Sequence, residues 1–384
     1  MKNIGIIGQG FVGTAVREKF RKTHTVLAYD KFSEDNSSTY TLDAELGAKN
    51  TLTELIQHCS VIFTCVPTPM FEDGECDTSI VESVVNEIAE LCGDTQSVTL
   101  ILKSTVPPGT TAKLNEISDK VLITFSPEFL TEANSIEDFD KQDRIVLGID
   151  YMEAVEPVRN TFTEAFPDAK IIVLNSREAE MSKYMTNLFL ATKVSFFNDM
   201  YSVCDKLGIN YTDTIEAVMH DPRIGKSHYM VPGPDGDRGY GGHCFPKDME
   251  AIMFIADENQ IRVPTLMGAS LTNRLVRTNK DWEEMEGRAV SKREADLELA
   301  NGVIGLEQPD FYYNINNPTE ITYDEDNIDP NEYWASVESQ LFNNGELLRE
   351  PKENEIIYRY TPDRGYILRL ELAVDTAVDQ KFED

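Results

Sequence analysis

A cysteine stands between a run of glycines and a proline in the stretch GYGGHCFPKD, residues 239–248. The glycines free the backbone and let another molecule come close. Pro246 suits the first turn of a helix, where a missing N–H costs nothing, and the residues after it have helical apolar spacing. We therefore expect Cys244 just ahead of a helix N-terminus, whose partial positive charge favours the nucleophilic thiolate, with Asp248 in the first turn. The alternative is a half-buried structural cysteine at a tight turn.

Lys183 and Asn187 are a second pair of side chains suited to chemistry. They lie in a segment with helical apolar spacing that starts at Ser176, and a separation of four residues places them on one helix face. A lysine and an asparagine that point together into a cleft can stabilise an oxyanion. The alternative is an ordinary solvated helix edge.

A loop rich in glycine and proline follows at residues 221–242 and carries Arg223, Lys226 and Arg238. The whole chain is strongly acidic, with a formal net charge of −32. In such a protein, a local basic cluster suits a phosphate-bearing substrate.

The N-terminal residues predict a strand, a glycine turn, a helix and a second strand. Gly8, Gly10 and Gly13 fit the GxGxxG pattern, in which the backbone approaches a pyrophosphate at a helix N-terminus. Asp30 follows 22 residues after Gly8, where a carboxylate accepts hydrogen bonds from ribose hydroxyls and favours NAD over NADP. Lys31 weakens this preference slightly. A plain strand–turn–helix is the alternative.

Three further apolar strands each end in polar residues: Thr68 lies beyond the first, Thr105 beyond the second and Glu128 beyond the third. Ligands of open parallel sheets lie beyond the carboxyl ends of the strands, so cofactor or substrate is expected at these positions. For any one of them, simple strand termination is an equal alternative. Residues 144–150 and 169–175 predict closing strands.

These patterns predict an α/β protein with an N-terminal Rossmann-like parallel sheet, a central α-helical domain and an acidic C-terminal segment. We place the NAD-binding domain at residues 1–175, the helical domain with the cysteine at 176–290, and an unassigned tail at 291–384. A long helix is expected from residue 263. Residues 354–374 predict a β-hairpin around Pro-Asp-Arg-Gly.

Composition narrows the function class. The 384 residues and 41% hydrophobic content are those of a globular protein with two or three domains. The acidity argues against binding to nucleic acid or an anionic membrane. The six cysteines show no CxxC pair and no zinc spacing, so we expect reduced thiols, a cytoplasmic location and no metal. The sequence has no recognisable signal peptide and no apolar membrane span.

Eight stretches match the motifs of one known family, in the family's order: IGIIGQGFVG, VPTP, KSTVPPGTT, SPEFLTEANSIEDF, EMSKYMTN, FFND, DPRIG and GYGGHCFPKD. With them the chain resembles the UDP-glucose/GDP-mannose dehydrogenases, and most closely the UDP-glucose 6-dehydrogenases, over residues 1–275. This resemblance favours a nucleophilic role for the cysteine over the structural one.

The resemblance implies oxidation of a sugar primary alcohol to a carboxylate with two NAD⁺. Cys244 would attack the intermediate aldehyde, and the thiohemiacetal would then be oxidised to a thioester that water hydrolyses. Lys183 and Asn187 match residues that hold the oxyanion, and Asp248 matches the acid that activates or places water. Thr105 and Glu128 match polar groups that position water and the sugar.

The resemblance also implies that Arg223 reaches the substrate site of a neighbouring subunit, in a homodimer formed through the central helices. The expected partner is a nucleotide-sugar substrate, with no nucleic acid and no membrane. The predicted cofactor-binding residues are Gly8, Gly10, Phe11, Val12, Gly13, Asp30, Lys31, Thr68 and Thr105. The predicted substrate-binding residues are Glu128, Lys183, Asn187, Arg223, Tyr229 and Gly241.

The chain departs from the family pattern after residue 290. Family members carry a second Rossmann-like domain there, and only NGVIGL at residue 301 resembles its opening strand. A protein that binds NAD or a nucleotide sugar without turnover is therefore an alternative. The sugar also stays open, because His243 resembles the branch that acts on acetylamino sugars such as UDP-N-acetylmannosamine, whereas residues 245–248 resemble the glucose branch. GDP-mannose is a further alternative.

Overall fold

The computed structural model describes residues 3–33, 37–47, 49–93 and 96–293, together with four short strands between residues 342 and 370. The chain divides into two compact units, residues 1–305 and 306–384. Every predicted site residue belongs to the first unit.

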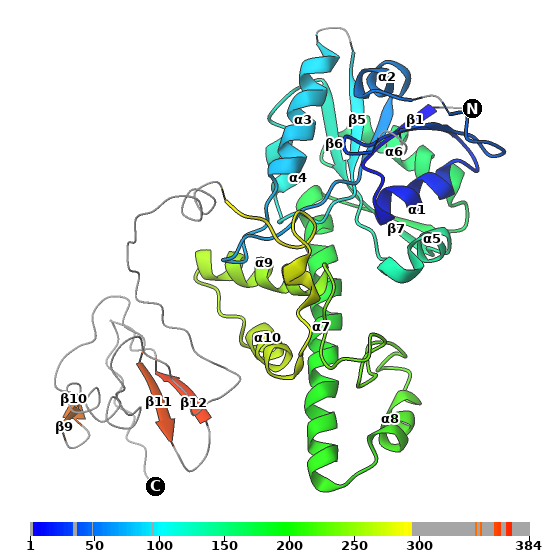
Figure 1. Cartoon of the computed structure of the whole chain (residues 1–384). Coiled ribbons are helices and arrows are strands. Elements are labelled where there is room, and N and C mark those ends of the chain that lie inside the picture. The colour runs from blue at the N-terminus through cyan, green and yellow to red at the C-terminus, as the bar shows by residue number, and fades with distance from the viewer. Residues whose placement is uncertain are drawn as a thin grey trace. The chain divides into compact units, whose positions relative to one another are not determined.

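An eight-stranded sheet forms the N-terminal part of the first unit (Figure 1). Its spatial order is β3-β2-β1-β4-β5-β6-β7-β8. The strands are β1 (Asn3–Ile7), β2 (Thr25–Tyr29), β3 (Thr39–Tyr40), β4 (Val61–Thr64), β5 (Val98–Leu102), β6 (Val121–Phe125), β7 (Arg144–Gly148) and β8 (Lys170–Leu174). From β2 to β6 all neighbours are parallel, so the predicted parallel sheet is confirmed for its centre.

The outer parts of this predominantly parallel sheet contain two antiparallel pairs. β3 pairs antiparallel with β2, because the short connection between them leaves no room for the crossover that a parallel pair needs. β7 meets β6 antiparallel through a single residue pair, Phe125 with Gly148. β7 and β8, the two predicted closing strands, are parallel to each other.

Helices cover both faces of the sheet, which is why its central strands are almost continuously apolar. One apolar cluster contains Leu55, Val85 and Leu100, and the other contains Phe20 and Phe162. The helices of this part are α1 (Phe11–Phe20), α2 (Leu52–His58), α3 (Ser79–Cys92), α4 (Thr110–Leu114), α5 (Ser135–Asp140), α6 (Met152–Ala165) and the short 3₁₀ helix η2 (Glu132–Asn134).

The central part is built on one long helix, α7 (Ser176–Leu207), which Figure 1 shows running from the sheet to α8 (Tyr211–Met219). A capping box between Asn175 and Glu178 starts α7, and Gly208 in a left-handed conformation ends it. α9 (Phe245–Glu258) and α10 (Pro264–Val276) pack against α7 around a shared apolar cluster. The predicted central helices are therefore confirmed.

The long helix expected from residue 263 is shorter than predicted, because α10 ends at Val276. The next residue, Arg277, has extended backbone angles and a buried side chain. Its guanidinium donates to the Asn279 carbonyl at 2.7 Å and forms an ion pair with Asp235 at 2.6 Å. These partners turn the chain into the 3₁₀ helix η3 (Asp281–Glu284).

After η3, residues 285–293 run back to the sheet; we call them the return segment. The backbone N–H of Met70 donates to the Ala289 carbonyl at 2.9 Å. The backbone N–H of Ser291 donates to the Met70 carbonyl at 2.8 Å. Arg293 forms ion pairs with Asp73 and Glu75. The return segment is thus fastened to the loop that follows β4.

The second unit is described only through β9 (Phe342–Asn343), β10 (Glu346–Leu347), β11 (Ile357–Thr361) and β12 (Tyr366–Leu370). β11 and β12 pair antiparallel, with Ile357 opposite Leu370, as the predicted hairpin requires. The turn of this hairpin, the NGVIGL stretch and the other residues of the predicted tail beyond residue 293 and these four strands lie outside the described residues.

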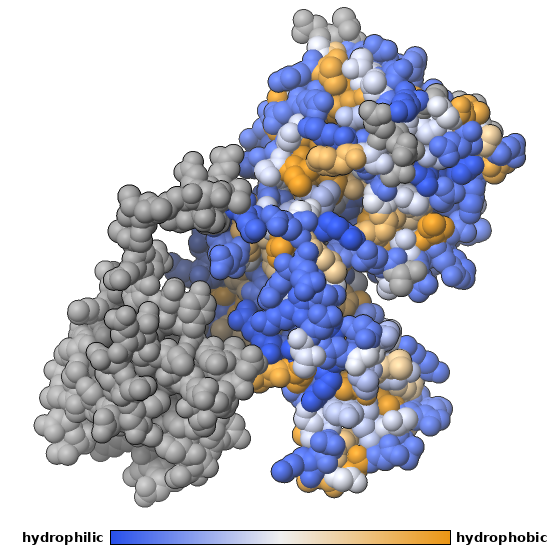
Figure 2. Space-filling model, viewed as in Figure 1, coloured by the Kyte–Doolittle hydropathy of each residue, from blue (hydrophilic) through white to orange (hydrophobic). Residues whose placement is uncertain are grey.

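On the face drawn in Figure 2, the described surface is mainly hydrophilic, and its hydrophobic residues lie in small separate groups. Within the described part of the chain, no helix combines the length and apolar character needed to cross a membrane. Among the same residues, no group of three His, Cys, Asp or Glu side chains is placed to hold a metal ion.

Candidate active site

The glycine loop after β1 has the geometry of a dinucleotide cradle. Gly8 has a φ of +84°, which favours glycine. A Cβ on Gly13 would lie 1.9 Å from the Gly8 carbonyl oxygen, whereas a Cβ on Gly10 would meet no atom within 4 Å. The first glycine therefore makes the turn, the third lets α1 pack on the strand, and the open space at the second is where a pyrophosphate approaches.

Asp30 lies just beyond the end of β2, half-buried beside this loop. One carboxylate oxygen accepts from the Gln9 N–H at 2.8 Å and the other from the Phe32 N–H at 2.9 Å. These bonds fix the carboxylate next to the loop, as ribose recognition requires. Lys31 is exposed, and Phe11 and Val12 begin α1.

The two glycines give a matched pair of variants. Gly13→Ala is expected to unfold or strongly destabilise the protein, because its Cβ would overlap a backbone oxygen that cannot move cheaply. Gly10→Ala is expected to leave the melting temperature nearly unchanged and to weaken NAD⁺ binding by roughly tenfold or more, since the new methyl group occupies the ligand's space. Thermal melting and calorimetric titration measure the two effects. Similar behaviour of the two variants would contradict the assignment of the loop.

Cys244 is the N-cap residue of α9, so its predicted place ahead of a helix N-terminus is confirmed. Its carbonyl accepts the Asp248 N–H at 3.0 Å, and Pro246 lies in the first turn. The residue is half-buried and keeps part of its surface open to solvent. It can therefore be reached by a small molecule.

One face of α7 carries three buried polar residues on successive turns, Glu180, Lys183 and Asn187, and the middle one, Lys183, interacts electrostatically with Cys244. Each one holds a different segment. Glu180 accepts the N–H groups of Gly109 and Thr111, in the turn before α4 and in its first turn, at 2.5 and 2.8 Å. α7 is thus the element to which the surrounding loops are fixed.

Lys183 holds Glu128, the acid that follows β6. Its ammonium lies 2.8 Å from the Glu128 carboxylate and donates to the Glu128 carbonyl at 2.6 Å. Burial opposes the charge on Lys183, but the negative groups around it, Glu128 foremost, raise its pKa overall. The lysine is therefore a cation beside the thiol, which is the charge that an oxyanion needs.

Asn187 holds Asp248, which is 1% exposed. The amide of Asn187 donates to one carboxylate oxygen at 2.6 Å, and the Lys247 ammonium binds the other at 2.6 Å. Burial acts against the charge of Lys247, but Asp248 raises the pKa of Lys247 overall. Asp248 is thus a buried carboxylate in the first turn after the cysteine, with one donor on each of its oxygens.

The protonation state predicted for Cys244 was wrong. Burial raises the pKa of the thiol to about 12, and the lowering by Lys183 is smaller than this effect, while Asp248 adds to it. The positive end of α9 and the neighbouring cation therefore do not keep a standing thiolate. The sulfur is a neutral thiol that must lose its proton as it reacts.

Thr68, Thr105 and Glu128 follow three parallel neighbours, β4, β5 and β6, and so lie at the same edge of the sheet, as predicted. The Thr68 hydroxyl donates to the Thr105 carbonyl at 2.6 Å, and the Ser104 hydroxyl donates to the Val66 carbonyl at 2.5 Å. These bonds fasten two strand ends to each other. The hydroxyl of Thr68 is occupied in this way, and the role of Thr105 toward ligands stays a prediction.

Three buried polar residues of this region did not stand out in the sequence: Glu180, Lys247 and Lys103. Lys103 follows β5 and donates to the Pro127 carbonyl at 3.0 Å, and its burial lowers its pKa to about 8. The signal for Glu180 was present, because it lies three residues before Lys183 on the same helix face. Lys103 had no comparable signal, since its partners come from another strand end.

Two of the cations that the 221–242 loop was predicted to gather have different partners. Arg223 is exposed and bonds Asp221, while Arg238 lies against α7, where it donates to Asn198 and Ser202. Arg223 and Arg238 are thus each bound by an acidic or polar neighbour, and the phosphate-binding role of the loop stays a prediction.

Tyr229 and Gly241 have structural contacts of their own. Tyr229 packs in an apolar cluster with Phe197 of α7 and with Ile215 and Met219 of α8, and its carbonyl accepts the Tyr211 hydroxyl at 2.7 Å. A Cβ on Gly241 would lie 2.3 Å from the Arg277 guanidinium, so this glycine allows close packing of the loop. The substrate contacts predicted for Arg223, Tyr229 and Gly241 stay predictions.

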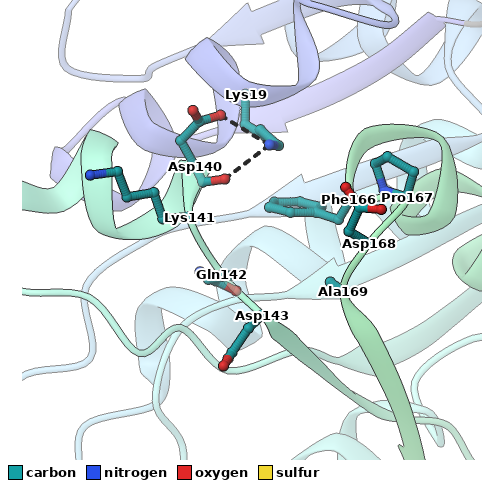
Figure 3. A pocket seen from close by; sticks show the side chains of 9 residues that line it. All are labelled: Lys19, Asp140, Lys141, Gln142, Asp143, Phe166, Pro167, Asp168 and Ala169. Carbon is teal, nitrogen blue, oxygen red and sulfur yellow. Dashed lines mark hydrogen bonds and ion pairs between the residues drawn. The ribbon is translucent and has the colours of Figure 1, made fainter.

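A surface depression of about 260 Å³ lies elsewhere, beside α1, α5 and the end of α6 (Figure 3). There the Lys19 ammonium binds both the carbonyl and the carboxylate of Asp140 and lies over the Phe166 ring. None of the predicted site residues lines it. The candidate site is therefore the cluster around Cys244 and the glycine loop.

Two domain models of one family match the chain. Residues 29–166 match the NAD-binding domain of the UDP-glucose/GDP-mannose dehydrogenase family, and residues 177–275 match its central domain. The chain belongs to the UDP-glucose/GDP-mannose dehydrogenase family. The match to the NAD-binding domain covers β3 to β7 and α2 to α6, and the match to the central domain covers nearly all of α7 to α10, with Cys244.

Curated relatives agree with this membership. A UDP-glucose 6-dehydrogenase of Pseudomonas aeruginosa is 35% identical over 227 residues, which are 56% of this chain and 48% of that protein. One of Rickettsia prowazekii is 33% identical over 251 residues, 64% of this chain and 55% of that protein. The chain thus spans about half the length of these two relatives.

A solved UDP-glucose dehydrogenase from Pyrobaculum islandicum has the same fold over 71% of this chain and 68% of its own. The TM-score is 0.61 and the sequence identity 28%.

Proposed function

We propose that this protein oxidises a nucleotide sugar with NAD⁺, and that the substrate is UDP-glucose and the product UDP-glucuronate. The observation that carries the proposal is the cluster of a reachable thiol, a buried ammonium and a buried carboxylate beside a dinucleotide cradle. Both oxidations belong to one site, because the aldehyde formed first stays bound to Cys244.

The proposed reaction has four steps. The primary alcohol loses a hydride and a proton and becomes an aldehyde. The Cys244 sulfur bonds to the aldehyde carbon while the thiol proton passes to the carbonyl oxygen, which gives a thiohemiacetal. Loss of a second hydride and a proton gives a thioester, and water then releases the carboxylate and restores the thiol. NAD⁺ accepts one hydride in each oxidation.

The chain's own residues have distinct roles in this scheme. The Lys183 ammonium stabilises the negative charge that develops on the carbonyl oxygen in the transition state of the attack by sulfur or water. Asn187 and Lys247 hold Asp248 in place, so that its carboxylate orients water for the hydrolysis. Glu128 holds the lysine and faces the same space. A neutral thiol suits this chemistry, because sulfur gives up its proton only when the aldehyde oxygen can take it.

A panel assay tests the proposal. Purified protein is incubated with UDP-glucose, UDP-N-acetylmannosamine or GDP-mannose and either NAD⁺ or NADP⁺, and absorbance is followed at 340 nm. We expect turnover with UDP-glucose and NAD⁺, and weak or no activity with NADP⁺, because Asp30 repels a 2′-phosphate. Turnover of another nucleotide sugar in place of UDP-glucose would show that the proposed substrate is wrong and would identify the correct one. Tight binding of NAD⁺ and UDP-glucose without NADH formation would favour the alternative of a binding protein.

We propose further that the protein forms a homodimer through α7 and α10. Both helices carry exposed apolar stripes: Met185 and Phe189 on α7 are 65% and 67% exposed, and Leu271 and Leu275 on α10 are 50% and 56% exposed. Large apolar patches of this kind are typical of protein interfaces.

We also propose a location in the reducing cytoplasm, and the six free cysteines support it.

The stripe gives a direct prediction for the dimer. Phe189→Glu is expected to yield a monomer in analytical ultracentrifugation, because it places a charge inside the interface. Met152→Glu is the matched control, since Met152 is 80% exposed on α6, outside the stripe. A wild-type monomer, or equal masses for both variants, would contradict the proposed interface.

A further inference from the structure

His243, the residue before the nucleophile, has a buried side chain with one nitrogen engaged and one not. The residue is 9% exposed, and its Nδ1 lies 3.2 Å from the Glu132 carboxylate of η2. Among the described residues, its buried Nε2 has no hydrogen-bond partner. Buried polar atoms without partners are rare, and each one calls for an explanation.

The neighbours of His243 determine which nitrogen carries the proton. Burial lowers the pKa of His243, so the ring is neutral. Burial alone would raise the pKa of Glu132, but its bond to Arg288 of the return segment and the nearby His243 lower it overall. A carboxylate can only accept, so the proton resides on Nδ1 and Nε2 presents a lone pair.

The His243 side chain lies between the two halves of the candidate site. The His243 ring packs edge-on against Phe11, with ring centroids 4.9 Å apart, and Phe11 directly follows Gly10 of the dinucleotide cradle. Cys244 is the next residue along the chain. A second buried acceptor, the Oε2 of Glu128, also has no partner among the described residues. Two unpartnered acceptors in one region indicate a ligand that brings donors.

We propose that His243 Nε2 accepts a hydrogen bond from a hydroxyl group of the bound ligand, and that Glu132 and Arg288 are positioning residues that fix its tautomer. The inference rests on the proposed function for the identity of the ligands. The hydroxyl belongs either to a ribose of NAD⁺ or to the nucleotide sugar. The two share the same chemistry, and the experiment separates them.

The charges that face His243 come from several segments. They are Glu132 of η2, Glu128 beyond β6, Lys247 of α9 and Arg288 of the return segment. The two acids favour protonation and the two cations oppose it. Below its lowered pKa the ring becomes a donor at both nitrogens, so ligand binding through Nε2 is lost as the pH falls and is complete once the ring is neutral.

Two variants of His243 make the test. His243→Asn keeps a polar group near the position of Nδ1 and removes the acceptor at Nε2, whereas His243→Gln places an amide oxygen near Nε2. Dissociation constants for NAD⁺ and for UDP-glucose are measured separately by calorimetry. We expect His243→Asn to weaken one of them by roughly ten- to a hundredfold, the scale of losing a bond to a buried group. His243→Gln should restore most of that loss.

The affected ligand identifies the source of the hydroxyl. Arg288→Met should weaken the same ligand to a smaller extent, and Lys292→Ala, which removes only an exposed pair with Glu286, is the control and should change nothing. Unchanged binding of both ligands in His243→Asn would overturn the inference, as would equal losses in the Asn and Gln variants.

A wild-type protein that binds neither ligand would contradict the proposed function, and the tautomer then tests the inference by itself. In ¹⁵N NMR of labelled histidine we expect the His243 Nε2 signal of an unprotonated nitrogen, which moves toward the protonated range in Glu132→Gln. A protonated Nε2 in the neutral wild-type ring would overturn the inference.

Discussion

Replacing Cys244 with alanine is expected to abolish carboxylate formation and to leave the fold and NAD⁺ binding intact. Cys244 is the reachable thiol of the described cluster, and a thiol can bond to the aldehyde carbon and hold it for a second oxidation. Loss of a nucleophile lowers turnover by roughly 10⁴-fold or more. The measurement is UDP-glucuronate formed per enzyme, together with thermal melting and NAD⁺ titration.

Cys244→Ser adds a second result. A serine hydroxyl is expected to trap the intermediate as a slowly hydrolysed ester, visible as added mass on the intact protein. Cys204→Ala is the control, because this buried cysteine lies near the far end of α7. Wild-type turnover in Cys244→Ser would return the residue to a structural role at a tight turn.

Replacing Lys183 is expected to have the second largest effect. The ammonium is the cation that pairs with Glu128 next to the thiol, and removing a group that stabilises an oxyanion lowers kcat by roughly 10²-fold or more. Lys183→Met also leaves the buried carboxylate of Glu128 without its partner, which costs about 3–5 kcal/mol of stability. The measurement is therefore kcat with the melting temperature beside it.

Two further variants separate catalysis from folding. Lys183→Met combined with Glu128→Gln removes both charges and should recover much of the stability without recovering kcat. Lys206→Ala, on an exposed position of the same helix, should change neither quantity. If the double variant regained kcat along with stability, Lys183 would be a structural cation only.

The parts of the site that the sequence predicted are those set by local chain geometry. Gly8, Gly13 and Asp30 could be placed because a glycine turn between a strand and a helix has few solutions. Cys244 could be placed at a helix start because Pro246 and the apolar spacing define that start. Lys183 and Asn187 share a helix face by their separation alone.

The parts that it missed depend on residues far apart in the chain. The end of α10 is set by Arg277, whose partner Asp235 lies in an earlier loop. The pKa of Cys244 depends on how deeply the fold buries the thiol, which spacing does not report. His243 acquires its orientation from Glu132 and, through it, from Arg288, and no local pattern connects these three residues.

The most direct test of the central claim is the number of NADH molecules formed for each UDP-glucose consumed. Limiting UDP-glucose is converted to completion with excess NAD⁺, and NADH, UDP-glucuronate and free aldehyde are quantified together. Covalent retention on Cys244 predicts two NADH and one UDP-glucuronate per UDP-glucose, with no free aldehyde. One NADH per sugar with accumulating aldehyde would contradict the covalent mechanism, and consumption of no UDP-glucose would contradict the proposed substrate.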